Sequence, residues 1–210
     1  MYNAPVCRGH RRDDGRIEVR GKEQMDAISA LHNRVSVAKL GEPGPNGTQL
    51  DIMLRAAMRA PDHGVLRPWR FMVIEGAQRE RLGDIFVEAR LQSEPDCDPA
   101  ALDKLRGKPL RAPMILVVVA ETDPDNRVPV VEQIVATGAA IQNIMVAAHA
   151  LGIGAMWRTG GMASHPLVKR RLGFADKDEI VGYIYLGTPT GSVKRVPEEA
   201  HVPYLRDMPQ

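Results

Sequence analysis

The chain has 210 residues, of which 44% are hydrophobic and 4% aromatic, and its 28 Lys and Arg stand against 26 Asp and Glu. A formal charge of +2 is too small for an extended nucleic-acid-binding surface, so we predict no nucleic-acid partner. The longest strictly apolar run spans residues 114–120, far short of the roughly 20 residues of a membrane-spanning helix, so we also predict no membrane segment.

Three regions follow one another along the chain. Residues 1–21 hold several arginines but no apolar stretch of a secretory signal, so we expect a flexible leader. Residues 22–190 carry the apolar patterns of one folded domain, and residues 191–210, with three prolines, are expected to form an extended arm. The two cysteines fit no disulfide or metal-site spacing, which predicts a cytoplasmic protein without a metal.

The domain begins with two predicted helices. Apolar residues at helical spacing predict the first over 22–33, and a loop rich in glycine and proline follows. We expect Thr48 to cap the second helix, with Asp51 completing a short capping box. Pro61 is predicted to end this helix near Arg59.

Strands and further helices alternate after this point. We predict four strands, over 71–74, 114–119, 154–157 and 180–186. The second of them is apolar throughout without alternation, which is typical of a central strand covered on both faces. Between them we predict an amphipathic helix after the first strand, a short helix begun by Asp98 and Pro99, a closely packed helix over 131–151, and a helix capped by Ser164 that ends near Leu172. The pattern predicts one α+β domain with helices around a mixed sheet.

Several kinds of site are excluded at the level of motifs. The chain has no G-x-G-x-x-G between a strand and a helix, no phosphate-binding P-loop and no G-x-S-x-G nucleophile elbow. Its six histidines never have zinc-site spacing. We therefore predict neither a catalytic side-chain nucleophile nor a metal site.

Polar residues gather at three places where the apolar patterns break, in the ranges 33–36, 59–69 and 157–161. Their arginines, hydroxyls and glycine-flanked amides suit a phosphate group, which predicts a phosphorylated ligand. Taken one at a time, the arginines could instead interact with helix-end carbonyls. The small residues of the predicted helix over 131–151 could likewise serve only close packing.

Three motifs occur in this order: Arg34-x-Ser36, then Ala60-Pro61-Asp62-His63 with Pro68-Trp69, then Gly154-x-x-Trp157-Arg158-Thr159-Gly160. Together they resemble the FMN-dependent nitroreductase family, above all its small bacterial members, and the likeness runs from about residue 25 to 189. The resemblance implies an α+β, nitroreductase-like fold with helices around a central mixed, mostly antiparallel sheet. It also implies an intertwined homodimer with FMN bound at the subunit interface.

The same resemblance implies which residues bind cofactors. FMN would be bound by three segments, consisting of Arg34, Val35 and Ser36, of Arg59 and His63, and of Trp157, Arg158 and Thr159. The first and third segments would hold the flavin phosphate or ring edge, whereas the second would reach the flavin bound mainly by the partner subunit. A nicotinamide dinucleotide is implied at Ala147, Ala148, His149, Ala150, Leu151 and Gly152.

The implied activity is that of an FMN-dependent NAD(P)H oxidoreductase. Hydride would pass from NADH or NADPH to flavin N5 and then, in a ping-pong cycle, to a nitroaromatic, a quinone or a similar small planar electrophile. Two alternatives stay open. One is a specialised flavin enzyme of the same fold that dehalogenates its substrate or degrades flavin. The other is a non-catalytic module that stores or senses FMN, which the apolar residues Val35 and Ala38 would suit.

Overall fold

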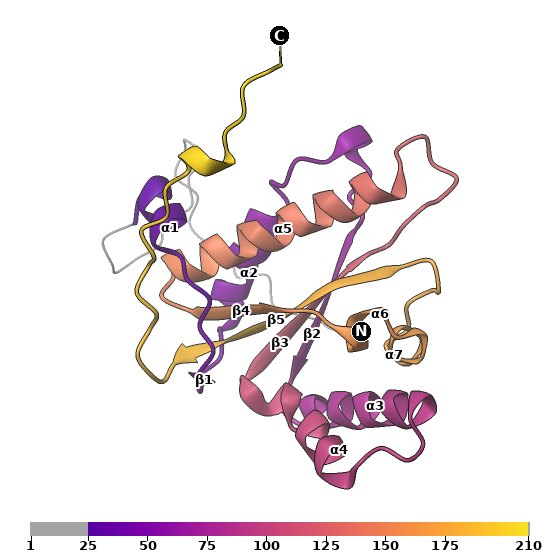
Figure 1. The fold of residues 1–210 in the computed structure, drawn as a ribbon. Helices are drawn as coiled ribbons and strands as arrows, with labels where there is room; N and C mark the ends of the chain where they lie inside the picture. The colour runs from indigo at the N-terminus through magenta and orange to yellow at the C-terminus, as the bar shows by residue number, and fades with distance from the viewer. Residues whose placement is uncertain (1–24, 210) are drawn as a thin grey trace.

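The computed structural model describes residues 25–209, and Figure 1 shows a sheet with helices on both faces. The sheet has the order β1 (Leu40–Gly41), β5 (Glu179–Pro189), β3 (Met114–Ala120) and β2 (Trp69–Glu75), and β4 (Gly154–Arg158) also pairs with β5. The predicted α+β fold is thereby confirmed. Every pairing between the described strands is antiparallel, so the parallel part of the expected mixed sheet is not found among them.

Strand β3 forms the centre of the core. All seven of its residues are buried, and it pairs with β2 on one side and β5 on the other. Because successive side chains of a strand point to opposite faces, Leu116 and Val118 join the cluster beneath α5, while Ile115 and Val117 join the cluster on the other face. Complete burial of such a side chain stabilises the fold by about 1.5–3 kcal/mol. The prediction of a strand covered on both faces is confirmed.

The upper face of the sheet in Figure 1 is covered by α5 (Val130–Ala150) and α2 (Gly47–Ala57). Alanines such as Ala140 and Ala148 are fully buried in α5, which brings this helix close to the sheet and to α2. Among the described helices, α5 alone is long and apolar enough to cross a membrane, a feature that a search for unbroken apolar runs misses. Helix α5 packs its apolar residues against the sheet, and this packing accounts for the apolar composition of the helix.

The opposite face carries α3 (Gln78–Ser93), α4 (Pro99–Arg106) and the short turn η2 (Lys108–Arg111). Phe86 of α3 meets Tyr183 of β5 edge to face, with ring centroids 5.5 Å apart. Gly83 lets α3 and α4 approach each other, since a Cβ atom there would lie 2.3 Å from the carbonyl oxygen of Arg106. Asp98 caps α4 as predicted, accepting a hydrogen bond from the Ala100 amide.

Two predicted helix caps are wrong. Helix α2 is capped by Asn46, and Gln49 completes its capping box, so Thr48 lies inside the first turn. Asp51 instead pairs with Arg55 one turn later, at 2.7 Å. Asn and Thr are both favourable cap residues. Because glycine is unfavourable inside a helix, the pattern placed the helix start after Gly47, two residues too late.

The second wrong cap concerns α7 (Pro166–Arg171). Its N-cap is His165, whose Nδ1 accepts a hydrogen bond from the Leu167 amide at 3.2 Å. Ser164 ends the separate short helix α6 (Gly161–Ser164), where its hydroxyl donates to the Gly161 carbonyl. Serine is the commoner cap, so sequence alone favoured it.

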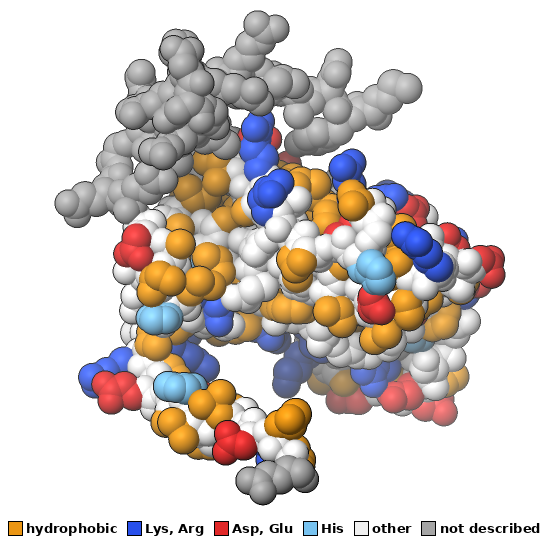
Figure 2. Space-filling view, turned by 90° about the horizontal axis from the view of Figure 1, so that it is seen from above, with side chains coloured by type: hydrophobic (Ala, Val, Ile, Leu, Met, Phe, Trp, Pro, Cys, Tyr) orange, Lys and Arg blue, Asp and Glu red, His pale blue; other side chains and the backbone are white. Residues whose placement is uncertain are grey.

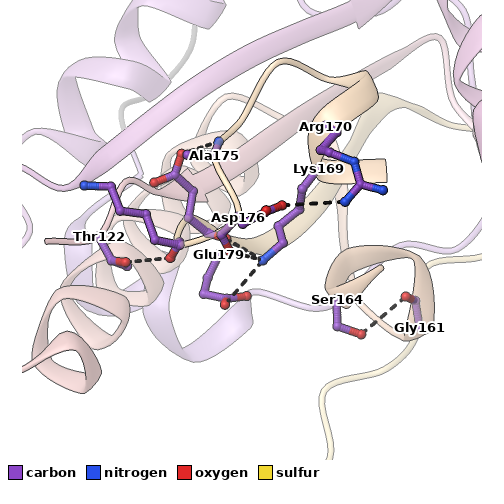
Figure 3. A network of polar contacts seen from close by, with 10 residues as sticks. Thr122, Gly161, Ser164, Lys169, Arg170, Ala175, Asp176 and Glu179 are labelled. Atoms are coloured by element: carbon purple, nitrogen blue, oxygen red, sulfur yellow. Dashed lines mark hydrogen bonds and ion pairs between the residues drawn. The ribbon is translucent and has the colours of Figure 1, made fainter. Parts of the chain in front are cut away.

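Lys169 of α7 is a buried cation held by the turn that leads into β5, as Figure 3 shows. Its Nζ donates to the carbonyl oxygens of Asp176 and Asp178 at 2.8 and 2.9 Å and lies 3.5 Å from a carboxylate oxygen of Glu179. Buried charges require such partners. Lys169 therefore fastens α7 to the start of β5 and serves the structure.

The described residues begin just before the first helix of the domain and continue into the segment that follows its last strand. Helix α1 (Ala27–Asn33) is capped by Asp26, and residues 22–24 of the predicted first helix, like the predicted leader 1–21, lie outside the described residues. After β5, residues 190–209 are exposed and contain only the turn η3 (Val202–Tyr204). Figures 1 and 2 show this arm standing away from the body of the molecule.

Candidate functional site

Strand β4 carries the third polar segment and sends two adjacent side chains to opposite faces of the sheet. Trp157 lies over Gly182 of β5 on the side of α5, and its Nε1 donates to the Val181 carbonyl at 3.1 Å. Trp157 as a whole residue stays 36% exposed. An exposed aromatic surface at the end of a strand can contact a planar ligand.

Arg158 points to the face that carries α3. Its guanidinium lies over the ring of Tyr185, 5.5 Å from the centroid, in cation–π geometry. The Nε atom is buried and has no hydrogen-bond partner among the described residues. Because unpaired buried donors are costly, this atom marks a place where a ligand can supply an acceptor.

The first polar segment lies beside β4. Arg34, Val35 and Ser36 are half-buried between α1 and β1, and the amide of Val37 donates to the Ala155 carbonyl at 2.9 Å. This hydrogen bond joins the first segment to the strand that carries the third. The structure therefore brings these two predicted segments together, although they are more than 100 residues apart in the chain.

Arg34 also lies near His149 in the last turn of α5. Burial lowers the pKa of His149 below its usual 6.5, and the positive charge of Arg34 adds a smaller effect in the same direction. The Nε2 atom of His149 is buried without a partner among the described residues. These surroundings favour the neutral form of the imidazole beside the first segment.

The predicted nicotinamide stretch, 147–152, is split between core and surface. Ala148 is fully buried, and Ala147 and Leu151 pack against the core, so these three side chains already serve packing. Ala150 and Gly152 are exposed, and Gly152 has the positive φ of 74° that ends α5.

The second polar segment lies at the other end of α5. Arg59 is exposed just beyond α2, and His63 in η1 (His63–Val65) places its Nδ1 2.6 Å from a carboxylate oxygen of Glu132. Glu132 belongs to the first turn of α5 and His149 to the last, which at 1.5 Å per residue places them about 25 Å apart. Within one chain, His63 is therefore remote from the first segment, whereas Arg59 lies closer, because its amide donates to the same Ala56 carbonyl that the side chain of Asn143 contacts.

This second segment has a strained backbone. Val65 and Arg67 have positive φ values of 56° and 51°, a conformation that costs non-glycine residues about 1–3 kcal/mol each. The carboxylate of Asp62 accepts a hydrogen bond from the Arg67 amide at 2.6 Å and holds the loop in place. Such strain is commonly kept at binding sites.

The sequence patterns missed a group of basic residues near Arg158. A pocket of about 340 Å³ opens beneath the end of β4, and its cationic lining consists of Arg90, Lys108, Arg111 and Arg158. Burial, together with the charges of Arg111 and Arg90, lowers the pKa of Lys108. The only sequence signal was the basic run of residues 104–111, which resembled an ordinary exposed helix end.

Comparison with known proteins identifies the family of this chain. A model of the nitroreductase family matches residues 33–188. "Putative NAD(P)H nitroreductase YdjA" of Escherichia coli K12 is 44% identical over 165 residues, covering 79% of this chain and 89% of the relative. A "Putative NAD(P)H nitroreductase" of Haemophilus influenzae is 34% identical over 172 residues, covering 81% and 92%. The chain belongs to the nitroreductase family, as its motifs predicted.

Solved structures show the same fold. A nitroreductase-like family protein from Bacillus cereus superimposes with a TM-score of 0.76 at 22% identity, covering 90% of this chain and 98% of the other. A nitroreductase-type protein from Desulfovibrio desulfuricans, solved in complex with FMN, gives a TM-score of 0.64 at 23% identity, covering 90% and 99%.

Proposed function

We propose that this protein is an FMN-dependent NAD(P)H oxidoreductase that reduces nitroaromatics, quinones or similar small planar electrophiles. The observation that carries the proposal is the hydrogen bond from Val37 to Ala155, which sets Arg34 and Ser36 beside the strand that bears Trp157, Arg158 and Thr159. The FMN complex of the Desulfovibrio desulfuricans protein, which has the same fold, and the NAD(P)H in the relatives' names support the two cofactors.

The residues of the two joined segments fit FMN. Arg34 and the Ser36 hydroxyl offer charge-assisted hydrogen bonds to a phosphate, and the Nε of Arg158, which has no partner within residues 25–209, offers another donor. Gly160 has a φ of 99° with open space around its α-carbon, so a ring edge can approach the backbone there. Bound FMN would accept hydride from NAD(P)H and pass it to the oxidant in a ping-pong cycle. The chain's own task is to position the flavin and keep one ring face accessible.

We further propose a homodimer that shares its two flavin sites. The separation of about 25 Å along α5 puts His63 far from the first segment of its own chain, so His63, together with Arg59, would complete the partner's site. Figure 2 shows hydrophobic side chains on the face that carries α5, and Val131 and Val135 are 64% and 66% exposed. A partner chain would bury this face. Sedimentation should give a dimer, and a folded monomer would contradict the shared site.

The decisive experiment is an anaerobic absorbance spectrum of the purified protein before and after NADH, then NADPH. We expect flavin bands that bleach with at least one donor. A colourless protein that cannot be reconstituted with FMN would refute the proposal. Bleaching without turnover of any nitro compound or quinone would favour the dehalogenating or flavin-degrading alternative, and bound but irreducible FMN would favour a storage module.

Substitutions test the assignment of individual residues. Arg34→Ala and Arg158→Ala should each weaken FMN binding by about 1.5–3 kcal/mol, the scale of a charge-assisted hydrogen bond. Arg81→Ala, which removes an exposed arginine of α3, is the matched control and should leave FMN affinity unchanged. Equal affinities in all three variants would show that the two arginines are misassigned. We place the protein in the cytoplasm, in accord with the free thiol of Cys97.

A further inference from the structure

Glu132, in the first turn of α5, pairs with the histidine of the second polar segment. One of its carboxylate oxygens lies 2.6 Å from the Nδ1 of His63, although the two residues are 69 positions apart in the chain. Within residues 25–209, neither side chain makes another hydrogen bond or ion pair. Glu132 belongs to none of the three segments that are expected to bind FMN. Its contact with His63 therefore needs an explanation of its own.

The chemistry of this pair fixes the position of one proton. An ionised carboxylate can only accept hydrogen bonds, so the proton between the two groups belongs to Nδ1 of His63. The negative charge of Glu132 also interacts favourably with the dipole at the start of α5. A neutral imidazole has a single N–H, and placing it on Nδ1 leaves Nε2 with a free lone pair. Glu132 thus selects the tautomer in which Nε2 accepts a hydrogen bond.

The loop that carries His63 is shaped to bring the imidazole to the start of α5. Gly64 has a φ of 74°, which favours glycine, and a Cβ atom added there would lie 3.2 Å from the Cγ2 of Val128. Glycine therefore lets the loop pack against Val128, which is buried four residues before Glu132. This close approach places His63 within hydrogen-bond distance of the carboxylate.

The pair is too exposed to be explained by stability. The side chains of His63 and Glu132 are 64% and 45% exposed, and exposed ion pairs contribute only about 0–1 kcal/mol. The strained φ values of Val65 and Arg67 in the same loop together cost about 2–6 kcal/mol. Asp62 already holds this loop through the Arg67 amide. A weak pair on a costly loop is better explained by the orientation that it gives to the imidazole.

His165 shows the contrasting case of a histidine whose ring serves the structure alone. Its Nδ1 accepts a hydrogen bond from the Leu167 amide, so in the neutral ring the proton lies on Nε2, which is 3.0 Å from the Ser93 hydroxyl. Both ring nitrogens of His165 are thereby engaged within the chain. The ring of His63 is oriented on one side only, and its Nε2 has no partner among the described residues.

We propose that Glu132 is a positioning residue, which orients the imidazole of His63 so that Nε2 accepts a hydrogen bond from the FMN of the partner subunit. An accepting Nε2 suits a ring N–H or a ribityl hydroxyl of FMN, whereas the phosphate is left to the arginines of the first and third segments. Glu132 itself does not touch the cofactor. This inference rests on the proposed function for the identity of the ligand, but the pairing of Glu132 with His63 does not.

The first test observes the tautomer directly. Nitrogen NMR of the histidine rings in the full chain is recorded at about pH 8, where histidine side chains are ordinarily neutral, and the His63→Ala variant identifies the signals of His63. The Nδ1–H form should predominate. Glu132→Gln should lower its fraction, because an amide can donate to Nδ1 as well as accept from it. Asp125→Asn, which removes an exposed carboxylate just before α5, is the matched control and should leave the tautomer unchanged.

The second test asks whether the pair acts on the cofactor, and it measures the FMN affinity of the full chain by the quenching of flavin fluorescence. Glu132→Gln and His63→Ala should each weaken FMN binding about five- to tenfold, the scale of one hydrogen bond. Asp125→Asn should change the affinity less than about twofold. In a His63→Ala background, Glu132→Gln should have no further effect, because Glu132 acts only through the imidazole.

Three results would overturn the inference. One is a predominant Nε2–H form of His63 in the wild-type protein, or an Nδ1–H fraction that Glu132→Gln leaves unchanged. Another is full FMN affinity in the folded Glu132→Gln variant. The third is an equal loss of affinity with and without His63, because Glu132 would then act on the fold as a whole. Backbone amide spectra check that each variant is folded, and the wild-type ring spectra need no variant of Glu132. If the protein binds no FMN, the proposed function fails, whereas the ring spectra still decide whether Glu132 orients His63.

Discussion

Gly182 of β5 controls the position of Trp157, and replacing it with alanine should displace the indole. An ideal Cβ atom at residue 182 would lie 2.1 Å from the Nε1 of Trp157 and 2.6 Å from its Cδ1. Gly182 is buried in the paired part of β5, so the strand itself has little freedom to move away. The indole must therefore turn out of its place and lose the hydrogen bond to the Val181 carbonyl.

The expected cost follows from these contacts. Overpacking of a filled site costs about 1–3 kcal/mol, and a lost hydrogen bond costs about 1 kcal/mol. Alanine in place of a strand glycine recovers about 0.5–1 kcal/mol through the entropy of the unfolded chain. We expect Gly182→Ala to lower the free energy of unfolding by about 2 kcal/mol, or Tm by roughly 4–8 °C for a chain of this size.

Urea unfolding and thermal melts measure this effect, and a double-mutant cycle isolates its cause. In a Trp157→Ala background the clash is absent, so Gly182→Ala should cost nothing there. Gly47→Ala is the matched control, because open space surrounds its α-carbon and the substitution should change stability by less than about 1 kcal/mol. An equal loss with and without the indole would refute the reasoning.

Two further predictions concern buried polar groups. Lys169→Met should lower the free energy of unfolding by about 3 kcal/mol, because it leaves the Asp176 and Asp178 carbonyls without their donor. Arg170→Met removes an exposed cation and should cost less than about 0.5 kcal/mol. The midpoints of urea unfolding compare the two variants. His149 should titrate below 6.5 in NMR spectra, and Arg34→Ala should raise its pKa. Because the pKa of His149 is lower in the folded chain, the unfolded chain binds a proton at this histidine more readily. The free energy of unfolding should therefore decrease as the pH falls through 6.5, and it should decrease less in a His149→Gln variant.

Much of the fold could be predicted because local patterns reflect their surroundings directly. The unbroken apolar run of β3 indicated a strand buried on both faces, and the small residues of α5 indicated a closely packed helix. Helix starts were less certain, since Asn46 and Thr48, or Ser164 and His165, are competing caps within one turn. Only the folded backbone shows which of these side chains accepts a hydrogen bond from a free amide at the helix start.

The site divides in the same way. The three motifs by themselves determined the family and the residue types that a phosphorylated cofactor requires. Tertiary structure alone decided which motifs meet, because the Val37–Ala155 hydrogen bond joins the first and third while the length of α5 separates His63 of the second from them. It also decided that the neighbours Trp157 and Arg158 face opposite sides of the sheet, since pairing with β5 sets which face each residue takes.

The cationic pocket shows most clearly why sequence could not be enough. Arg90, Lys108 and Arg111 come from α3 and η2, and Arg158 from β4, and in the sequence each resembles an ordinary exposed charge. Their shared electrostatic field exists only after α3 packs beneath the sheet and brings these elements together. Composition and periodicity determined that this chain forms an α+β domain, and its motifs determined the nitroreductase family. Long-range packing decided where its positive charges gather, because Coulomb interactions depend on distance in space rather than on separation along the chain.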